Sequence, residues 1–330
     1  MALTSSSKQL DAHQKALAIN LDQTIFGSFA EIGAGQEVAR WFLRVGGASG
    51  TVAKTVSAYD KEVSDDLYGA GSRYVSVQRL EAMLNREWNL LLTQLKESRG
   101  PSTRFFSFAD TVSARNYSGT NECHGWMGIR FQDQPGGAVH DILLHLNLRD
   151  FSNLSQQEVL GIVGVNLIYA TFYQRTSPEG LLKILCDQVS LERIEIDFIE
   201  VRGPAFRAWN RQDLLLGLVR ENLAETVVFP SESDWGPPTE ILRKRPIILA
   251  PLGLGGLTRA HKDMLSAAMR ELIVQLGDAS TKPLGFFTIT ISLNSVPPPA
   301  NSSFDFSSRL EALASLGSGV QCLVTANFIE

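Results

Sequence analysis

Three consecutive segments between residues 103 and 150 alternate apolar and polar side chains, and this alternation constrains the fold more than any other feature. They read TRFFSFADTVSAR, CHGWMGIRFQ and HDILLHLNLRD. Because successive side chains of a strand point to opposite faces, each segment predicts a strand with one apolar and one polar face. Polar loops with Gly119 and with the Pro-Gly-Gly run at residues 135–137 separate the segments. The three segments therefore predict an antiparallel meander.

Helical patterns dominate before the meander and alternate with strand patterns after it. Between residues 77 and 95, apolar side chains recur every three or four positions, as in an amphipathic helix. The apolar run at residues 159–173 predicts a buried helix, in which Asn166 is expected to make a structural hydrogen bond. We predict an α/β protein with a helical N-terminal region over residues 1–100. An α/β domain with a mixed, partly parallel sheet is predicted over residues 101–330.

The last strand pattern, residues 320–328, lies two residues before the last residue of the sequence. It is largely apolar, and a strand of this kind belongs inside a sheet that is covered on both faces. Either this strand is a protected edge, or the domain is truncated at its C-terminus. A truncated domain would expose apolar surface, so a homo-oligomer formed through that surface is the expected consequence.

Composition and charge argue against several classes of partner and site. The chain has 30 Lys and Arg against 35 Asp and Glu, a formal charge of -5 and no long basic run, so no nucleic acid partner is expected. Its three cysteines lack Cys-x-x-Cys spacing, which predicts a reducing compartment and no metal site.

Localisation is predicted from the N-terminal residues and from the longest apolar run. Asp11, His13 and Lys15 stand where a signal peptide has its apolar core, which predicts a cytoplasmic protein. The run at residues 159–173 is shorter than the roughly 20 residues of a membrane-spanning helix, so no membrane association is expected.

The stretch FAEIGAGQEVARWF, residues 29–42, resembles a nucleotide-binding turn. A dinucleotide fingerprint needs G-x-G-x-x-G directly after a strand; Gly33 and Gly35 fit, but Val38 occupies the third position. The apolar residues before Gly33 recur three apart, which is not the period of a strand. We therefore expect a turn that enters a helix near Gln36, without a strand before it.

Two ligand interpretations of the same stretch stay open. A helix N-terminus presents unpaired N–H groups, so Gly33 and Gly35 remain candidate ligand-binding residues for an anion. The residues EIGAGQE also match the Glu-x-Gly-x-Gly-x-Gly motif of S-adenosylmethionine-dependent methyltransferases, except that Glu37 replaces the last glycine. A methyltransferase is a minor alternative, against which the missing strand before Gly33 counts. Residues 51–60 have a helical pattern, which counts against Asp60 as the acid of a dinucleotide fingerprint.

The polar face of the meander is the second candidate site. If the three strands pair, this face gathers Ser107, His124, Trp126, Arg130, His145, Asn147 and Arg149. The guanidinium of arginine binds phosphate or carboxylate through two parallel hydrogen bonds, and histidine transfers protons near neutral pH. The two histidines are therefore the catalytic candidates, and the other five residues are the candidates for ligand binding. A solvated face is the alternative. Trp126 favours a bound ligand, because an exposed tryptophan on a polar face usually packs over another group.

Four blocks of the sequence together resemble an uncharacterised bacterial protein family. They are FGSFAEIGAGQEVARWF, ASGTVAKTVSAYD, HGWMGIRFQ and VLGIVGVNLIYATFY, and the resemblance runs from about Asn20 to the C-terminus. Members of that family often carry the labels nicotinate-nucleotide adenylyltransferase or TonB-dependent receptor, and they extend beyond residue 330. The first label implies a His-x-Gly-His motif, of which HGWM at residues 124–127 retains only the first histidine. The second implies a signal peptide, so neither label matches these residues.

These features together predict a cytoplasmic enzyme that acts on a small anionic, phosphorylated or nucleotide-like substrate, with transferases among the candidate classes. They identify no cofactor. The alternative is a non-catalytic binding or assembly protein whose polar sheet face meets another protein.

Overall fold

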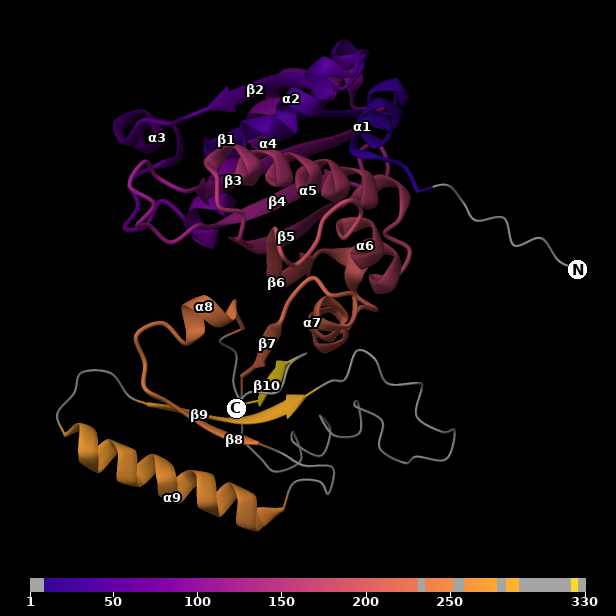
Figure 1. Cartoon of the computed structure of the whole chain (residues 1–330). Coiled ribbons are helices and arrows are strands. Elements are labelled where there is room, and N and C mark those ends of the chain that lie inside the picture. The colour runs from indigo at the N-terminus through magenta and orange to yellow at the C-terminus, as the bar shows by residue number, and fades with distance from the viewer. Residues whose placement is uncertain (1–8, 231–234, 252–257, 278–282, 291–321, 326–330) are drawn as a thin grey trace, which may run out of the picture. The chain divides into compact units, whose positions relative to one another are not determined.

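A computed structural model describes residues 9–230, 235–251, 258–277, 283–290 and 322–325 of the chain. The chain forms two compact units. One comprises residues 1–217 and 221–223, and the other comprises residues 218–220 and 224–330. Each unit contains a sheet of its own (Figure 1).

The first unit is built on a six-stranded mixed sheet in the order β2-β1-β3-β4-β5-β6. Its strands are β1 Ile25–Gly33, β2 Val52–Ser57, β3 Arg104–Ser113, β4 His124–Gln132, β5 Val139–Leu148 and β6 Ile194–Arg202. β1 runs parallel to both β2 and β3, whereas β3 to β6 pair antiparallel in chain order. The predicted mixed α/β fold is confirmed, and so is the meander.

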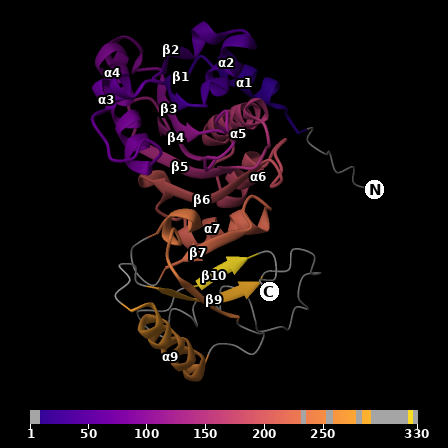
Figure 2. The same ribbon diagram turned by 60° about the vertical axis from the view of Figure 1, so that its left-hand side comes forward.

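Helices cover both faces of this sheet. The helices and helical turns of this part of the chain are α1 Ala12–Leu21, α2 Gln36–Arg44, η1 Ala48–Gly50, α3 Lys61–Tyr68, α4 Val77–Arg99, α5 Asn153–Tyr173, α6 Pro178–Leu185, η2 Pro204–Phe206 and α7 Arg211–Arg220. Figure 2 shows α3 and α4 on one face, and α1, α2 and α5 on the other. Phe42 of α2 packs on Phe29, and Leu80 of α4 lies beside Gly128 on the opposite face.

The region before residue 100 is helical in large part, as predicted, but it also contains two strands that the sequence interpretation missed. β1 is buried along nearly its whole length, because helices cover it on both sides. A strand covered on both faces does not need to alternate, which is why its apolar residues did not show the strand period. Residues 52–57, expected as helix, form the edge strand β2, in which half-buried and exposed side chains alternate.

The glycine turn lies between β1 and α2. The expected helix does begin at Gln36, but the expectation that no strand precedes the turn is wrong. Gly33 has a φ of +91°, and a Cβ there would lie 1.9 Å from the carbonyl oxygen of Val112. A Cβ at Gly35 would lie 1.9 Å from Oδ1 of Asp110. Both glycines are therefore required by the close approach of β3.

The second unit contains a four-stranded sheet in the order β7-β10-β9-β8. Its elements are β7 Thr226–Phe229, α8 Pro238–Ile241, β8 Ile247–Pro251, α9 Arg259–Leu276, β9 Leu284–Thr290 and β10 Cys322–Thr325. β10 pairs antiparallel with β7 and parallel with β9, so it lies inside the sheet and is not the protected edge considered above. The sequence pattern around Leu310 also predicts a helix, and that segment lies outside the described residues.

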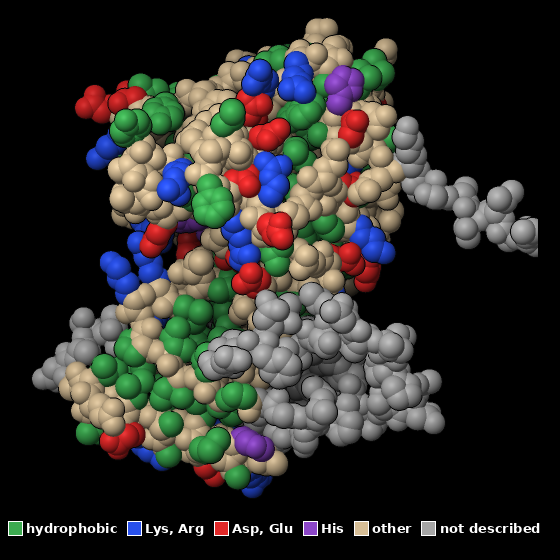
Figure 3. All heavy atoms as spheres, in the orientation of Figure 1, with side chains coloured by type: hydrophobic (Ala, Val, Ile, Leu, Met, Phe, Trp, Pro, Cys, Tyr) green, Lys and Arg blue, Asp and Glu red, His purple; other side chains and the backbone are tan. Residues whose placement is uncertain are grey.

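Charges of both signs alternate on the face of the first unit seen in Figure 3, without a patch of one sign. Among the described helices, none is both long enough and apolar enough to cross a membrane.

The turn offers a test of the close approach of β1 and β3. Gly46 has a φ of +93°, and a Cβ there would meet no described heavy atom within 4 Å, so it matches Gly33 in conformation but not in crowding. We expect Gly46→Ala to cost about 1 kcal/mol of unfolding free energy through backbone strain. Gly33→Ala should cost at least ~2 kcal/mol more, because it also overlaps Val112. Urea denaturation of both variants measures the difference, and equal losses would contradict the steric explanation.

Candidate functional site

An open crevice of about 700 Å³ lies where β1 and β3 end. Its walls come from the glycine turn, the end of β3 with the loop that follows, and the first turn of α5. β1 continues into a helix and returns to the sheet as β2, whereas β3 continues into the loop that leads to β4. Their connections thus leave in opposite directions along the sheet. Ligands of open α/β sheets bind at the carboxyl ends of strands at such a switch point.

The polar lining of the crevice favours an anion. Among the described residues that line it, only Arg115 carries a charge; the others include the amides of Gln36, Asn116, Asn121 and Asn153. The N-termini of α2 and α5 contribute the positive ends of their helix dipoles. A crevice of this composition attracts phosphate or carboxylate groups.

Arg115 differs from the arginines that form ion pairs elsewhere in the first unit. No carboxylate of the described chain lies within ion-pair distance of its guanidinium. Its backbone is fixed, because its N–H donates to Oε1 of Gln156 at 2.7 Å and its carbonyl accepts from Nδ2 of Asn153 at 2.9 Å. Asn121 ties down the same loop by donating to the carbonyl of Ala114 at 2.7 Å. The loop therefore presents a positioned arginine to the crevice.

Tyr59 stands at the rim of the crevice, just after β2, and is 82% exposed. Its ring offers a surface on which a planar group can stack. The next residue, Asp60, is the N-cap of α3 and accepts from the backbone N–H groups of Glu62 and Val63. Asp60 is therefore occupied by the helix and is not placed like the ribose-binding acid of a dinucleotide fingerprint.

Two buried carboxyl groups lie behind the glycine turn. Glu31 on β1 and Asp110 on β3 are register partners, 2% and 0% exposed. Glu31 accepts from the N–H of Ala39 at 3.4 Å, and neither side-chain oxygen of Asp110 has a hydrogen-bond partner among the described residues. Burial raises the pKa of Glu31 to about 8. Burial, and then the neighbouring Glu31, raise the pKa of Asp110 well above its usual range. Near neutral pH both groups are mainly protonated, so they place little negative charge behind the crevice.

The predicted polar face of the meander exists, but α4 covers part of it. Register pairing places His124, Arg130 and His145 on one face, as expected. Ser107 is fully buried and lies 3.1 Å from the hydroxyl of Ser28. Trp126 was expected to be exposed, but it is 2% exposed and packs edge-on against the ring of His145. The face is therefore neither a solvated surface nor an open ligand platform around Trp126.

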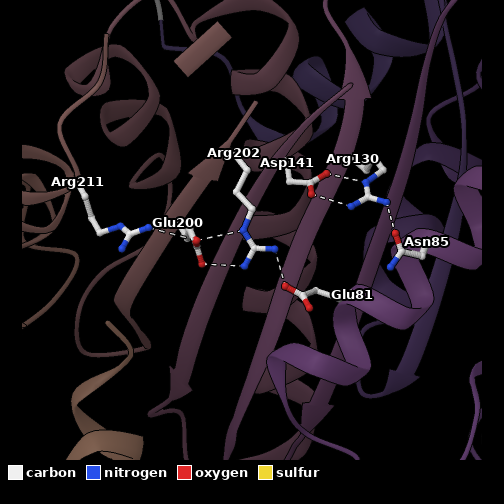
Figure 4. Close-up of polar contacts among 7 residues, drawn as sticks. All are labelled: Glu81, Asn85, Arg130, Asp141, Glu200, Arg202 and Arg211. Carbon is white, nitrogen blue, oxygen red and sulfur yellow. Dashed lines mark hydrogen bonds and ion pairs between the residues drawn. The ribbon is translucent and has the colours of Figure 1, made fainter. Parts of the chain in front are cut away.

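The two arginines of that face are engaged by carboxylates. Arg130 forms two bonds to Asp141, of 2.7 and 2.8 Å, and a third to Asn85 of α4 (Figure 4). Arg149 donates to Glu195 at 2.8 Å. Both guanidinium groups thus lie in ion pairs, in contrast to Arg115.

Figure 4 also shows how these ion pairs continue across the sheet. Arg202 of β6 bonds to Glu200 and to Glu81 of α4, and Arg211 bonds to Glu200 in turn. Pairs of opposite charge in this geometry tie the covering helix to the strands, so we interpret the network as structural.

Several residues of the site were missed by sequence reasoning. Arg115 is the last residue of the first predicted strand segment, and alternation along that segment does not show that the strand ends at Ser113 and that Arg115 belongs to the loop after it. Asp110 and Glu31 did leave a signal, since each is an acidic residue inside an otherwise apolar strand.

Metal ligation finds no support in the described part of the chain. There, no three His, Cys, Asp or Glu side chains gather closely enough to hold an ion. The three cysteines are free thiols: Cys123 and Cys186 are half-buried, and Cys322 is buried.

Comparison with known proteins leaves the function open. No protein-family model matches the sequence, and no curated protein matches it significantly. Among solved structures, the chain is similar to a competence/damage inducible protein, CihA, of Agrobacterium tumefaciens, at 19% identity and a TM-score of 0.35. That match covers 49% of this chain and 95% of the other. A CinA superfamily protein of Enterobacter cloacae matches at 12% identity and a TM-score of 0.37, over 52% of this chain and 98% of the other. Likeness at this level carries no argument about function.

The buried carboxyl of Glu31 predicts a specific pH dependence. Its pKa is raised in the folded state, so the folded chain binds this proton more tightly than the unfolded chain. The stability that the protonated group contributes is therefore complete below its usual pKa and is lost as pH rises towards about 8. Glu31→Gln removes the titration and keeps the shape. We expect the variant to gain roughly 2 kcal/mol relative to wild type between pH 5.5 and 7.5.

Urea denaturation at the two pH values measures this gain. Glu97→Gln, on an exposed position of α4, is the matched control and should show no comparable change. A difference between Glu31→Gln and wild type that stays constant with pH would contradict the assignment.

Proposed function

We propose that this chain is a cytoplasmic enzyme that binds a small phosphorylated or nucleotide-like substrate in the crevice at the ends of β1 and β3. The observation that carries the proposal is Arg115: a guanidinium without a carboxylate partner in the described chain, held on a fixed loop in a crevice whose described lining contains no acid. The volume of about 700 Å³ is in the range of small-molecule sites.

The arrangement supports a mode of binding. A phosphate or carboxylate group would accept hydrogen bonds from the guanidinium of Arg115 and from the amides near the N-termini of α2 and α5. A planar base or ring would stack on Tyr59 at the rim. Protonation of the buried Glu31 and Asp110 limits the repulsion that an anion would otherwise meet. The three free thiols favour the cytoplasm over an oxidising compartment.

S-adenosylmethionine is a second candidate ligand, because the sequence EIGAG joins a strand to a helix. Against a methyltransferase, the strands that follow β3 are antiparallel, so the turn is not part of a long parallel sheet. A binding or assembly protein without catalysis is the other alternative; it predicts no small-molecule ligand in the crevice.

A thermal-shift panel tests the proposal. It contains ATP, NAD, nicotinamide mononucleotide, sugar phosphates and S-adenosylmethionine. A ligand at 100 times its Kd should stabilise the chain by ~2.7 kcal/mol. Arg115→Gln should weaken binding of that ligand at least about tenfold, since a hydrogen bond to a charged group contributes about 1.5–3 kcal/mol.

Arg207→Gln is the matched control, because Arg207 is exposed and lies outside the crevice. It makes the same change in net charge and should leave the affinity unchanged. If both variants weaken ligand binding equally, the loss comes from the change in net charge and not from a specific contact of Arg115. Absence of any response in the panel would favour the assembly alternative.

A further inference from the structure

Two glutamines line the crevice with their side-chain amides held in a defined orientation. Gln36 is the first residue of α2, and Gln157 lies near the start of α5; both are half-buried. A glutamine amide has a donor end, the NH₂ group, and an acceptor end, the oxygen Oε1. Contacts with the rest of the chain show which end of each amide is engaged.

The donor end of Gln36 is engaged by the glycine turn and by β2. Its Nε2 donates to the carbonyl of Gly33 at 2.7 Å and to the hydroxyl of Ser57 at 3.0 Å. A carbonyl oxygen only accepts, so the end of the amide that faces Gly33 is the NH₂ group. Both N–H bonds of Gln36 are then used, and no described residue donates to its Oε1.

Two successive hydrogen bonds orient the amide of Gln157 in the same sense. The carbonyl of Arg115 accepts from Nδ2 of Asn153 at 2.9 Å, so the other end of the Asn153 amide is the acceptor Oδ1. Nε2 of Gln157 donates to that oxygen. The acceptor end of Gln157 is Oε1, and no donor to it lies in the described part of the chain.

The amide of Asn116, which also lines the crevice, is turned the other way. Its Oδ1 accepts from the hydroxyl of Ser118 at 3.1 Å and from the N–H of Thr120 at 3.2 Å, so Nδ2 remains as a donor. In addition to the guanidinium of Arg115, the lining thus offers two side-chain acceptors and a side-chain donor. A hydroxyl group both donates and accepts hydrogen bonds, so hydroxyl groups match this mixture.

The charge of the lining favours neutral donors on the ligand. An ammonium group that leaves water is costly unless a carboxylate pairs with it, and no described residue of the lining is acidic. The neutral oxygens of the two glutamines instead suit O–H groups. A small molecule that combines a phosphate with several hydroxyl groups is a phosphorylated sugar.

We infer that the crevice recognises the sugar of a phosphorylated sugar, and that Gln36 and Gln157 are specificity-determining residues that accept hydrogen bonds from its hydroxyl groups. This inference rests on the proposed function, in which Arg115 and the backbone N–H groups at the starts of α2 and α5 bind the phosphate. The sugar is either free, as in ribose 5-phosphate, or part of a nucleotide, as in AMP. A ligand without the hydroxyl groups would desolvate the two acceptors and offer them no donor, so it would bind more weakly.

Paired ligands test the inference by isothermal titration calorimetry. AMP and its 2′,3′-dideoxy analogue share the phosphate and the base and differ only in the two sugar hydroxyl groups. Wild type should bind AMP at least about tenfold more tightly, since two neutral hydrogen bonds contribute roughly threefold each. Gln36→Met and Gln157→Met keep the length of the side chain and remove the acceptor. Each variant should therefore reduce the preference for AMP about threefold.

Gln94→Met is the matched control. Gln94 is exposed on α4, which covers the other face of the sheet, so this variant should keep the wild-type preference. The loss of a structural hydrogen bond alone would weaken both ligands equally and leave their ratio unchanged. An unchanged ratio in both Gln36→Met and Gln157→Met would therefore overturn the role of the two glutamines. Equal affinity of wild type for AMP and the analogue would overturn sugar recognition, and this measurement does not depend on whether a variant folds.

A second ligand pair distinguishes the two sources of the sugar. Ribose 5-phosphate and 2-deoxyribose 5-phosphate make the same comparison without a base. A preference for the hydroxylated ligand in both pairs supports recognition of the sugar phosphate itself, whereas a preference within the AMP pair alone assigns the sugar of a nucleotide.

The two proposals fail in different ways. If AMP and its analogue bind equally and Arg115→Gln weakens both, the proposed function stands and sugar recognition fails. If AMP, ribose 5-phosphate and the thermal-shift panel all give no response, the proposed function fails, and sugar recognition fails with it.

Discussion

The parallel pairing of β1 with β3 is the constraint on which the rest of the first unit depends. The two strands stay in register from Ile25 opposite Arg104 to Gly33 opposite Val112. This register requires a residue without a side chain at Gly33, because the carbonyl of Val112 occupies the space of a Cβ. It also brings the glycine turn, the start of α2 and the loop after β3 to one end of the sheet. The crevice exists because these two strands end together while their connections separate.

Burial of charge follows from the same pairing. On the face covered by α2, Glu31 meets Asp110, and both carboxyls hold their protons because burial disfavours their charged forms. On the face covered by α4, the carboxylate of Asp141 is paired with Arg130. A buried charge is costly unless it is paired or neutralised, and the sheet uses both solutions. The charge of Arg115 needs neither pairing nor neutralisation, because this side chain lies in an open crevice.

Part of this architecture could be predicted. Alternation along β4 and β5 placed His124, Arg130 and His145 on one face, because the two-residue period of a strand is a local property. Asn166 was expected to make a structural hydrogen bond in the core. It accepts from Nζ of Lys15 at 2.8 Å and donates to the carbonyl of Asp187 at 2.7 Å, so it joins α1 to the segment after α6. β1 could not be recognised in the same way, because a strand covered on both faces loses its alternation.

The sequence by itself determined the mixed α/β class, the meander and the helix that begins at Gln36, since periodicity and turn residues are encoded locally. Tertiary structure decided which polar residues are available to a ligand. Arg130 and Arg149 looked like anion-binding residues until their partners Asp141 and Glu195 were placed beside them. The crevice and the Glu31–Asp110 pair both join strands that are distant in the chain. Availability and protonation depend on what surrounds a side chain, and those surroundings come from pairing between strands far apart in the sequence.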